Sequence, residues 1–338
     1  MIGIALDGHG GPEVLVPRSM PRPEPGRGEV LIRVAAAGVN APDLAQRRGH
    51  YDPPPGHSPL PGLEVAGEIA ALGPGVDGLV PGEQVLALCN GGGYAEYVSV
   101  PAGQVLPLPS GLDLVAGAAL PETFFTVMQT LVMRAGLRPG MYVLVHGAAG
   151  GIGGAAIQIS RLYGARPIGV VSSAEKAAYA VSLGAEAVID HGREDIVARV
   201  REVTDGHGAD RIVTFSGGDV AGLNVRAAAW GGHIVQLAAL GDRHGNVDLG
   251  LLVARQLAVS GSTLRPQPSE VKTAIAMRLR AEIWPGFADG RLRAPRIATY
   301  PMADATEAHR SMERRDNYGK IVLLTPYGLG KNKDKFVA

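Results

Sequence analysis

A glycine-rich segment carries the clearest chemical signal in the sequence. It reads GAAGGIGG over residues 147–154, directly after the apolar stretch Met141–Val145 and before a helical pattern. Small residues let a backbone approach a pyrophosphate closely, and a helix N-terminus offers free N–H groups and a positive dipole end. The strand-to-helix setting favours a dinucleotide-binding turn over an ordinary tight turn.

The second apolar strand of this region indicates which dinucleotide is bound. It ends at Val171 and is followed by Ser172, Ser173 and Lys176. An Asp or Glu usually accepts the free ribose 2′-hydroxyl of NAD(H) at that point. Hydroxyls and an ammonium group suit a 2′-phosphate better, so we predict NADP(H). Two alternatives stay open, because Glu175 could accept from a ribose hydroxyl and Lys176 could be an ordinary solvated helix residue.

The chain shows two successive patterns of apolar, Gly and Pro residues, and together they predict its fold class. Up to about residue 118 short apolar runs are broken by Gly and Pro, which is typical of a β-rich unit. From about residue 140 strands alternate with helices, and six such strands imply a doubly wound parallel sheet. We predict an α/β protein with a β-rich unit, residues 1–118 and 265–338, and a dinucleotide domain, residues 119–264. Residues 269–290 are expected to form one helix.

The composition excludes several classes of protein. The chain has 338 residues with 32 basic and 32 acidic side chains, so its formal net charge is zero. A neutral chain without a basic stretch has no footprint for nucleic acid or anionic membranes. The single cysteine, Cys89, excludes a disulfide framework and is expected to be an inert small residue. Without a signal-peptide pattern at its start, the chain is expected to be soluble and cytoplasmic.

A β-rich unit followed by a dinucleotide domain resembles the medium-chain dehydrogenase/reductase superfamily. Its zinc members place a Cys where this chain has Asn40, and a His-Glu pair where it has Leu63 and Glu64. Neither Asn nor Leu is a plausible zinc ligand. Alcohol oxidation without a Lewis acid loses its main source of rate, so we do not expect that activity.

Several motifs are more closely similar to the zinc-free quinone oxidoreductase branch, and most to its p53-inducible type. They occur in family order over residues 1 to about 325. The matching segments are residues 40–47 (NAPDLAQR), 49–56 (GHYDPPPG), 91–98 (GGGYAEYV), 120–122 (LPE) with Thr126, 261–265 (GSTLR) and 319–323 (GKIVL).

The resemblance implies a GroES-like catalytic domain, a Rossmann domain and NADPH-dependent reduction of quinones. It also implies a homodimer formed through the edge of the Rossmann sheet. His191 stands where the family often has a Tyr near the adenosine phosphate, and a histidine binds phosphate only when protonated. The other cofactor contacts implied are Asn40, Thr126, Ala238 and Ala239 near the nicotinamide; Gly150, Gly151 and Ile152 at the phosphates; Ser173 and Lys176 at the 2′-phosphate; and Ser216, Gly217, Leu264 and Asn317.

Hydride transfer to a quinone or an enone builds negative charge on oxygen, which a hydrogen-bond donor must stabilise. The candidate catalytic residues are Tyr51 and Asn40. Tyr51 matches the Gly-x-Tyr-x-x-x-Pro setting of the tyrosine acid in related enoyl-thioester reductases. It could instead only shape the pocket, and Asn40 could instead form an Asx-turn. Asp43 and Glu64 are expected to pair with Arg47 or Arg48.

Two other functions stay open. The first is an NADPH-dependent enone or 2-enoyl-thioester reductase, for which Arg47, Arg48, Arg265 and Arg293 could form a basic rim that receives a carrier. The second is a cofactor-binding protein with a structural or RNA-binding role, against which the neutral charge argues. The charged segment at residues 307–315 is expected to be a solvated helix face.

Overall fold

The structure is a computed structural model that describes residues 1–314 and 318–331. The chain forms two compact units, Met1–Phe125 with Arg265–Ala338 and Thr126–Leu264. We call them the first and the second unit. Residues 119–125, expected from the sequence in the dinucleotide domain, pack within the first unit. No helix in the described part of the chain combines the length and apolar character needed to cross a bilayer.

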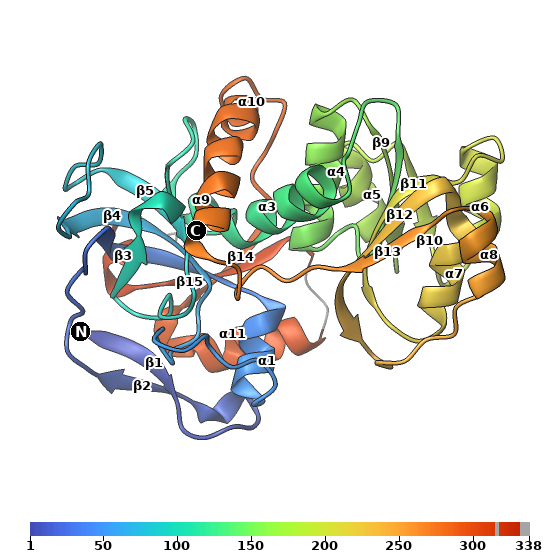
Figure 1. Ribbon diagram of the computed structural model, residues 1–338. Helices are drawn as coiled ribbons and strands as arrows, with labels where there is room; N and C mark the ends of the chain where they lie inside the picture. Colours follow the sequence, from blue (N-terminus) through green and yellow to red (C-terminus); the bar gives the residue numbers. More distant parts are fainter. Residues whose placement is uncertain (315–317, 332–338) are drawn as a thin grey trace. The chain divides into compact units, whose positions relative to one another are not determined.

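The first unit is built on a seven-stranded sheet (Figure 1). Its central strand β3 pairs antiparallel with β4, β6 and β15, and nearly all of its residues are buried. The strands of this unit are β1 (Ile2–Leu6), β2 (Leu15–Ser19), β3 (Glu29–Val39), β4 (Glu64–Leu72), β5 (Gln84–Leu88), β6 (Tyr97–Pro101), β7 (Val105–Pro107), β14 (Ile297–Pro301) and β15 (Lys320–Leu324).

Short helices connect the strands of this unit. They are α1 (Ala41–Arg47), α2 (Leu114–Gly117), α3 (Pro121–Val127), α9 (Ser269–Arg278), α10 (Trp284–Ala288), α11 (Ala305–Arg314) and α12 (Pro326–Lys331). The single helix expected over residues 269–290 is interrupted by a π-helical segment, Leu279–Ile283, between α9 and α10. Pro285 lacks an N–H and so begins α10 afresh at its first turn.

The second unit confirms the expected doubly wound parallel sheet. Its strand order is β10-β9-β8-β11-β12-β13, which is the Rossmann order 3-2-1-4-5-6. The strands are β8 (Tyr142–Val145), β9 (Arg166–Val171), β10 (Ala187–Asp190), β11 (Ala209–Ser216), β12 (Ala228–Leu240) and β13 (Ala258–Gly261). The helices are α4 (Gly151–Leu162), α5 (Ala174–Ser182), α6 (Ile196–Val203), α7 (Asp219–Ala227) and α8 (Leu249–Ala254).

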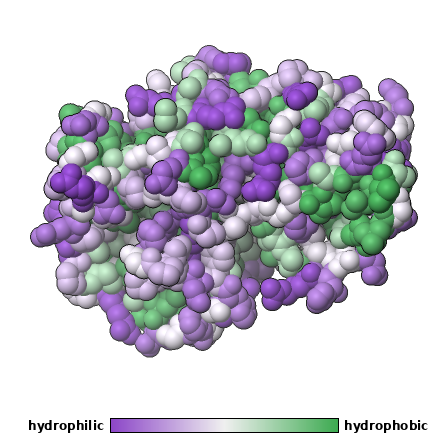
Figure 2. Space-filling view, viewed as in Figure 1, coloured by the Kyte–Doolittle hydropathy of each residue, from purple (hydrophilic) through white to green (hydrophobic). Residues whose placement is uncertain are grey.

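One side of the second unit exposes large apolar side chains. Trp230, Leu249, Val253 and Val259 are all more than half exposed. Figure 2 shows a continuous hydrophobic area over the side that carries α8. Edge strand β13 contributes Val259 to this exposed set, so the edge is apolar as well as unpaired in the sheet.

Candidate functional site

The glycine-rich turn of the second unit joins β8 to α4 as the sequence predicts. Gly147 has a positive φ of 59°, and a Cβ on Gly153 would lie 2.3 Å from the Gly147 carbonyl oxygen. Gly150 is the N-cap of α4, and its N–H donates to that same carbonyl at 2.9 Å. The first N–H groups of a helix have no partner within the helix. The turn therefore fits a dinucleotide pyrophosphate at the N–H groups of Gly151 and Ile152, whereas the N–H of Gly150, the third residue expected there, already donates to Gly147.

The end of β9 brings hydroxyl and ammonium groups together. Ser173 caps α5, and its Oγ accepts from the Lys176 N–H at 3.3 Å. The Nζ atom of Lys176 donates to the Ser172 Oγ at 3.2 Å. Glu175 is exposed in the first turn of the same helix. These donors fit a 2′-phosphate, and in the alternative Glu175 is the group that would accept from a ribose hydroxyl.

The other predicted cofactor residues of this unit follow neighbouring strands. Parallel strands place the residues after their carboxyl ends along one edge of the sheet, where dinucleotides bind. His191 is exposed after β10, and Gly217 follows β11, where its N–H donates to Leu240 at 3.1 Å. Ser216 ends β11, Ala238 and Ala239 lie near the end of β12, and Thr126 and Leu264 are buried at the two ends of the unit's sequence. Asn317 lies outside the described residues.

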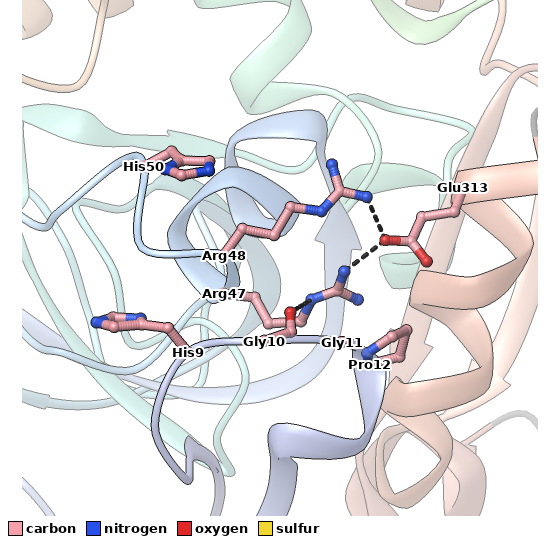
Figure 3. A pocket seen from close by; sticks show the side chains of 8 residues that line it. All are labelled: His9, Gly10, Gly11, Pro12, Arg47, Arg48, His50 and Glu313. Atoms are coloured by element: carbon pink, nitrogen blue, oxygen red, sulfur yellow. Dashed lines mark hydrogen bonds and ion pairs between the residues drawn. The ribbon is translucent and has the colours of Figure 1, made fainter.

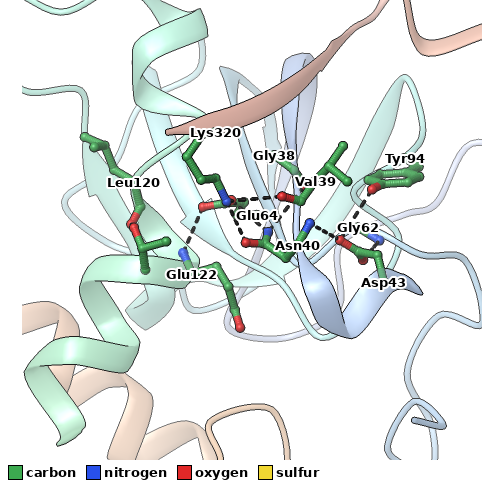
Figure 4. A network of polar contacts seen from close by, with 11 residues as sticks. Gly38, Val39, Asn40, Asp43, Gly62, Glu64, Tyr94, Leu120, Glu122 and Lys320 are labelled. Carbon is green, nitrogen blue, oxygen red and sulfur yellow. Dashed lines mark hydrogen bonds and ion pairs between the residues drawn. The ribbon is translucent and has the colours of Figure 1, made fainter. Parts of the chain in front are cut away.

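A buried polar network in the first unit surrounds Asn40 (Figure 4). Its Nδ2 donates to Glu64 Oε1 at 2.8 Å, and its Oδ1 accepts from Lys320 Nζ at 2.5 Å. Lys320 also donates to Glu64 Oε1 at 2.5 Å and to the Val39 carbonyl at 3.3 Å. The amide of Asn40 thus holds a carboxylate and an ammonium group. Asn40 is also the N-cap of α1, where its N–H donates to Asp43 Oδ2 at 2.8 Å and its backbone carbonyl accepts from the Asp43 N–H at 3.0 Å.

Asp43 has partners other than those expected from the sequence. Its carboxylate accepts from the N–H groups of Asn40 and Gly62 at 2.8 and 2.9 Å and from the Tyr94 hydroxyl at 3.3 Å. Burial raises the pKa of Asp43 to about 6, and the two backbone hydrogen bonds act in the opposite direction. The predicted pairing of Asp43 and Glu64 with Arg47 or Arg48 is wrong. Glu64 instead pairs with Lys320, which lies 256 positions away in the sequence.

Arg47 and Arg48 instead share one carboxylate. Both donate to Oε1 of Glu313 on α11, as Figure 3 shows, and Arg47 Nε also donates to the Gly10 carbonyl at 3.1 Å. This carboxylate offsets the charge that a basic rim would need. The α11 face is also less solvated than predicted, because His309 is fully buried against the Tyr94 hydroxyl.

Two buried cations, Arg265 and Lys272, hold the loop that carries Tyr51. Arg265 donates through Nε and Nη2 to the Asn90 carbonyl at 2.9 and 2.7 Å, and through Nη1 to the Tyr51 carbonyl at 3.3 Å. Its guanidinium lies over the Tyr51 ring. Lys272, which is fully buried, donates to Asn90 Oδ1 at 2.5 Å and to the Arg265 carbonyl at 2.7 Å. Burial lowers the pKa of Lys272 to about 8.

Glu122 borders the Asn40 network from α3. Its backbone N–H donates to Glu64 Oε2 at 2.9 Å. Burial, and next the neighbouring Glu64 carboxylate, raise the pKa of Glu122 to about 8. A half-buried carboxyl group that holds its proton at neutral pH is suited to acid catalysis.

Comparison with known proteins identifies the family. Residues 26–110 match the alcohol dehydrogenase GroES-like domain, and residues 151–280 match the zinc-binding dehydrogenase domain. The chain is 32% identical to human quinone oxidoreductase over 320 residues, which cover 93% of this chain and 95% of that protein. The chain belongs to the quinone oxidoreductase family of medium-chain dehydrogenases/reductases. It is an oxidoreductase.

Other relatives of this oxidoreductase carry different names. It is 30% identical over 333 residues to a phenolphthiocerol/phthiocerol polyketide synthase chain of Mycobacterium tuberculosis, and it spans only 15% of that protein's length. The structure of Escherichia coli quinone oxidoreductase with NADPH aligns with a TM-score of 0.83 at 29% identity, covering 96% of this chain and 100% of that one.

Two further solved structures share the fold of this oxidoreductase over 96% of its chain and 99% of theirs. An NAD-dependent alcohol dehydrogenase aligns with a TM-score of 0.85 at 34% identity. The CurK enoyl reductase aligns with a TM-score of 0.83 at 25% identity.

Sequence reasoning about this oxidoreductase missed three polar residues of the first unit. Glu122 and Lys320 lie inside motifs that signal the family but give no role to either residue. Lys272 lies in a helical pattern where a lysine predicts solvent, yet it is fully buried. A charged residue within an otherwise apolar segment, such as Lys320 before Ile321–Leu324, is the one signal that could have marked such a position.

Proposed function

We propose that the chain is an NADPH-dependent reductase of quinones that works without zinc. The observation that carries the cofactor choice is the cluster of Ser172, Ser173 and Lys176 at the end of β9, which offers donors to a 2′-phosphate. The NADPH complex of the Escherichia coli relative supports it. The similarity to human quinone oxidoreductase supports the substrate class.

The site residues of this proposal are those expected from the sequence. In the second unit, the α4 N-terminus would hold the pyrophosphate, and the cofactor itself would supply a hydride. In the first unit, Tyr51 would face the acceptor from a loop that Arg265 holds through backbone hydrogen bonds. The Asn40 side chain would mainly line the site in a fixed orientation, because Glu64 and Lys320 already bind both ends of its amide.

Purified protein should oxidise NADPH, and NADH much more slowly, when given ortho- or para-quinones. One structural neighbour is named as NAD-dependent, so both cofactors must be compared. Two results would overturn this proposal: turnover that uses NADH but not NADPH, or failure to reduce any of the quinones.

A second candidate is an enone or 2-enoyl-thioester reductase that uses the same hydride. The similarity to the CurK enoyl reductase favours it. The predicted basic rim does not favour it, because Glu313 pairs with both Arg47 and Arg48. Faster turnover of an enone or a 2-enoyl thioester than of any quinone would transfer the assignment to this activity.

We also propose a homodimer through the edge of the second unit's sheet. Strand β13 is last in the strand order, and Val259 on it is 53% exposed. An exposed apolar edge strand is a template for pairing with another chain, and two-fold pairing of identical edges closes it. The cytoplasmic location stays a prediction, which cell fractionation checks.

A further inference from the structure

We propose that Glu122 is the acid that protonates the oxygen of the acceptor during its reduction. The inference rests on the proposed reductase function and adds to it the source of the proton. The sequence marks Glu122 only as part of the Leu120-Pro121-Glu122 motif, whereas the structure places it at the rim of a buried network of charges.

The backbone of Glu122 is anchored and its side chain is available. Its N–H donates to Glu64 Oε2 at 2.9 Å, while Glu64 Oε1 accepts from Asn40 and Lys320. The Glu122 carboxyl group itself has no hydrogen bond to any side chain or backbone group in the part of the chain that the structure describes. Figure 4 shows it directed away from Glu64 and Asn40. A group held at its main chain, with a free acidic end, can reach a ligand without breaking the network.

The surroundings explain both the protonated and the ionised state of this carboxyl group. Burial and the negative charge of Glu64 favour the neutral acid, so Glu122 holds a proton at neutral pH. Lys320 and Arg265 favour the carboxylate that remains after the proton has left. The charged and titratable groups that act on Glu122 or feel its charge are Glu64 on β4, Lys320 on β15, Asp43 on α1, Lys272 on α9, Arg265 and Cys89.

The proton balance of the reaction requires such a group. The acceptor would receive a hydride, and with it both electrons of the new bond, from a bound nicotinamide cofactor. The π electrons of the carbonyl group, or of the conjugated enone, move onto the oxygen. The Glu122 O–H bond breaks as the new O–H bond forms, and water then returns a proton to the carboxylate. Asn40 cannot supply this proton, because an amide is not an acid and its Nδ2 already donates to Glu64 Oε1.

The test compares Glu122→Gln and Glu122→Asp with Glu24→Gln, a control at an exposed loop position. A general acid contributes about 100-fold or more, so Glu122→Gln should lower kcat with an enone by about that factor with little change in KM. Glu122→Asp keeps the acid and should restore part of the rate. Glu24→Gln should match the wild type. The fall in kcat at high pH should be present in the wild type and absent in Glu122→Gln.

A second readout needs neither cofactor nor turnover. Infrared difference spectra of the cofactor-free protein should show a carboxylic-acid band that disappears around pH 8 in the wild type and in Glu24→Gln, but not in Glu122→Gln. An active wild type with an equally active Glu122→Gln variant and an unchanged pH profile would overturn the inference, as would the absence of that band. A wild type that reduces no acceptor would instead overturn the proposed function, and the acid role with it.

Discussion

The Nζ atom of Lys320 lies 2.5 Å from Oε1 of Glu64, and the two side chains are 4% and 0% exposed. The pair joins β15 to β4 across β3, between residues 256 positions apart in the sequence. All the donors of Lys320 that the structure shows point to oxygen atoms of the same network. The pair therefore anchors the side-chain amide of Asn40 and, through Glu64 Oε2, the backbone of Glu122.

Removing one member of this pair should strongly destabilise the first unit. Lys320→Met leaves Glu64 as an unpaired buried charge, which costs about 3–5 kcal/mol of unfolding free energy. Urea denaturation measures this loss. Arg18→Ala is the control, because Arg18 and Asp7 form an exposed pair worth less than about 1 kcal/mol. An equally small effect of Lys320→Met would contradict the structural role given to the pair.

Gly38→Ala should disturb the same network by crowding it. A Cβ at this position would lie 2.0 Å from Glu64 Oε1 and 2.7 Å from the Ala118 carbonyl oxygen. We expect a loss of about 1–3 kcal/mol, measured by thermal or urea unfolding. Gly330→Ala is the matched control, since a Cβ there would meet no atom within 4 Å and alanine favours a helix at that position. Equal stabilities for the two variants would rule out the crowding.

Acid should destabilise the protein through buried histidines. Burial, and next the charge of Arg47, lower the pKa of His309 to about 3, so the folded state binds fewer protons than the unfolded state between about pH 6.5 and 3. The contribution of His309 is present above pH 6.5 and is lost as the pH falls, by up to about 1.4 kcal/mol per pH unit.

Urea unfolding at a series of pH values measures this dependence. His309→Gln should flatten it below pH 6.5, because glutamine does not titrate. The raised pKa of Asp43 works in the opposite sense, since its contribution is lost as the pH rises toward about 6. Comparison of the variant with the wild type at each pH removes that background. Parallel curves for the two proteins would show that His309 does not carry the effect.

Lys176→Ala should reduce the preference for NADPH over NADH. A charge-assisted hydrogen bond to a phosphate is worth about 1.5 kcal/mol or more, so the ratio of kcat/KM for the two cofactors should fall about tenfold. Steady-state rates with each cofactor measure it. Glu175→Gln tests the alternative, because loss of NADH activity in that variant would indicate a carboxylate that binds a ribose hydroxyl. A Lys176→Ala variant that keeps the full preference for NADPH would contradict the assignment of Lys176 to the 2′-phosphate.

Val259→Lys should break the proposed homodimer. A lysine on an edge strand opposes pairing with a second copy of the same edge. Size-exclusion chromatography with light scattering should show a dimer for the wild type and a monomer for the variant. Met277→Lys is the control, because Met277 is 68% exposed on α9 in the first unit. A wild type that is monomeric, or a variant that stays dimeric, would remove this interface.

Local patterns were enough to predict the architecture. The alternation of strands and helices predicts the parallel sheet, and glycines at positions 147 and 153 predict the tight turn after its first strand. Both depend on neighbours in the sequence: a positive φ at Gly147 and a close approach at Gly153 are needed within one short loop. The prediction of a single helix over residues 269–290 was wrong, because a π-helical segment interrupts it. This prediction too rested only on neighbours in the sequence.

The sequence by itself determined the two kinds of domain, the dinucleotide turn and the family, because short-range spacing and motif order encode them. Only the tertiary structure decided which charges meet. Lys320 meets Glu64 and Arg47 meets Glu313 across more than 250 residues, and no local pattern specifies a partner so distant. The raised pKa of Glu122 follows from burial and from Glu64, which are properties of the packed fold rather than of residues 120–122. Desolvation and long-range Coulomb interactions exist only once the chain has folded.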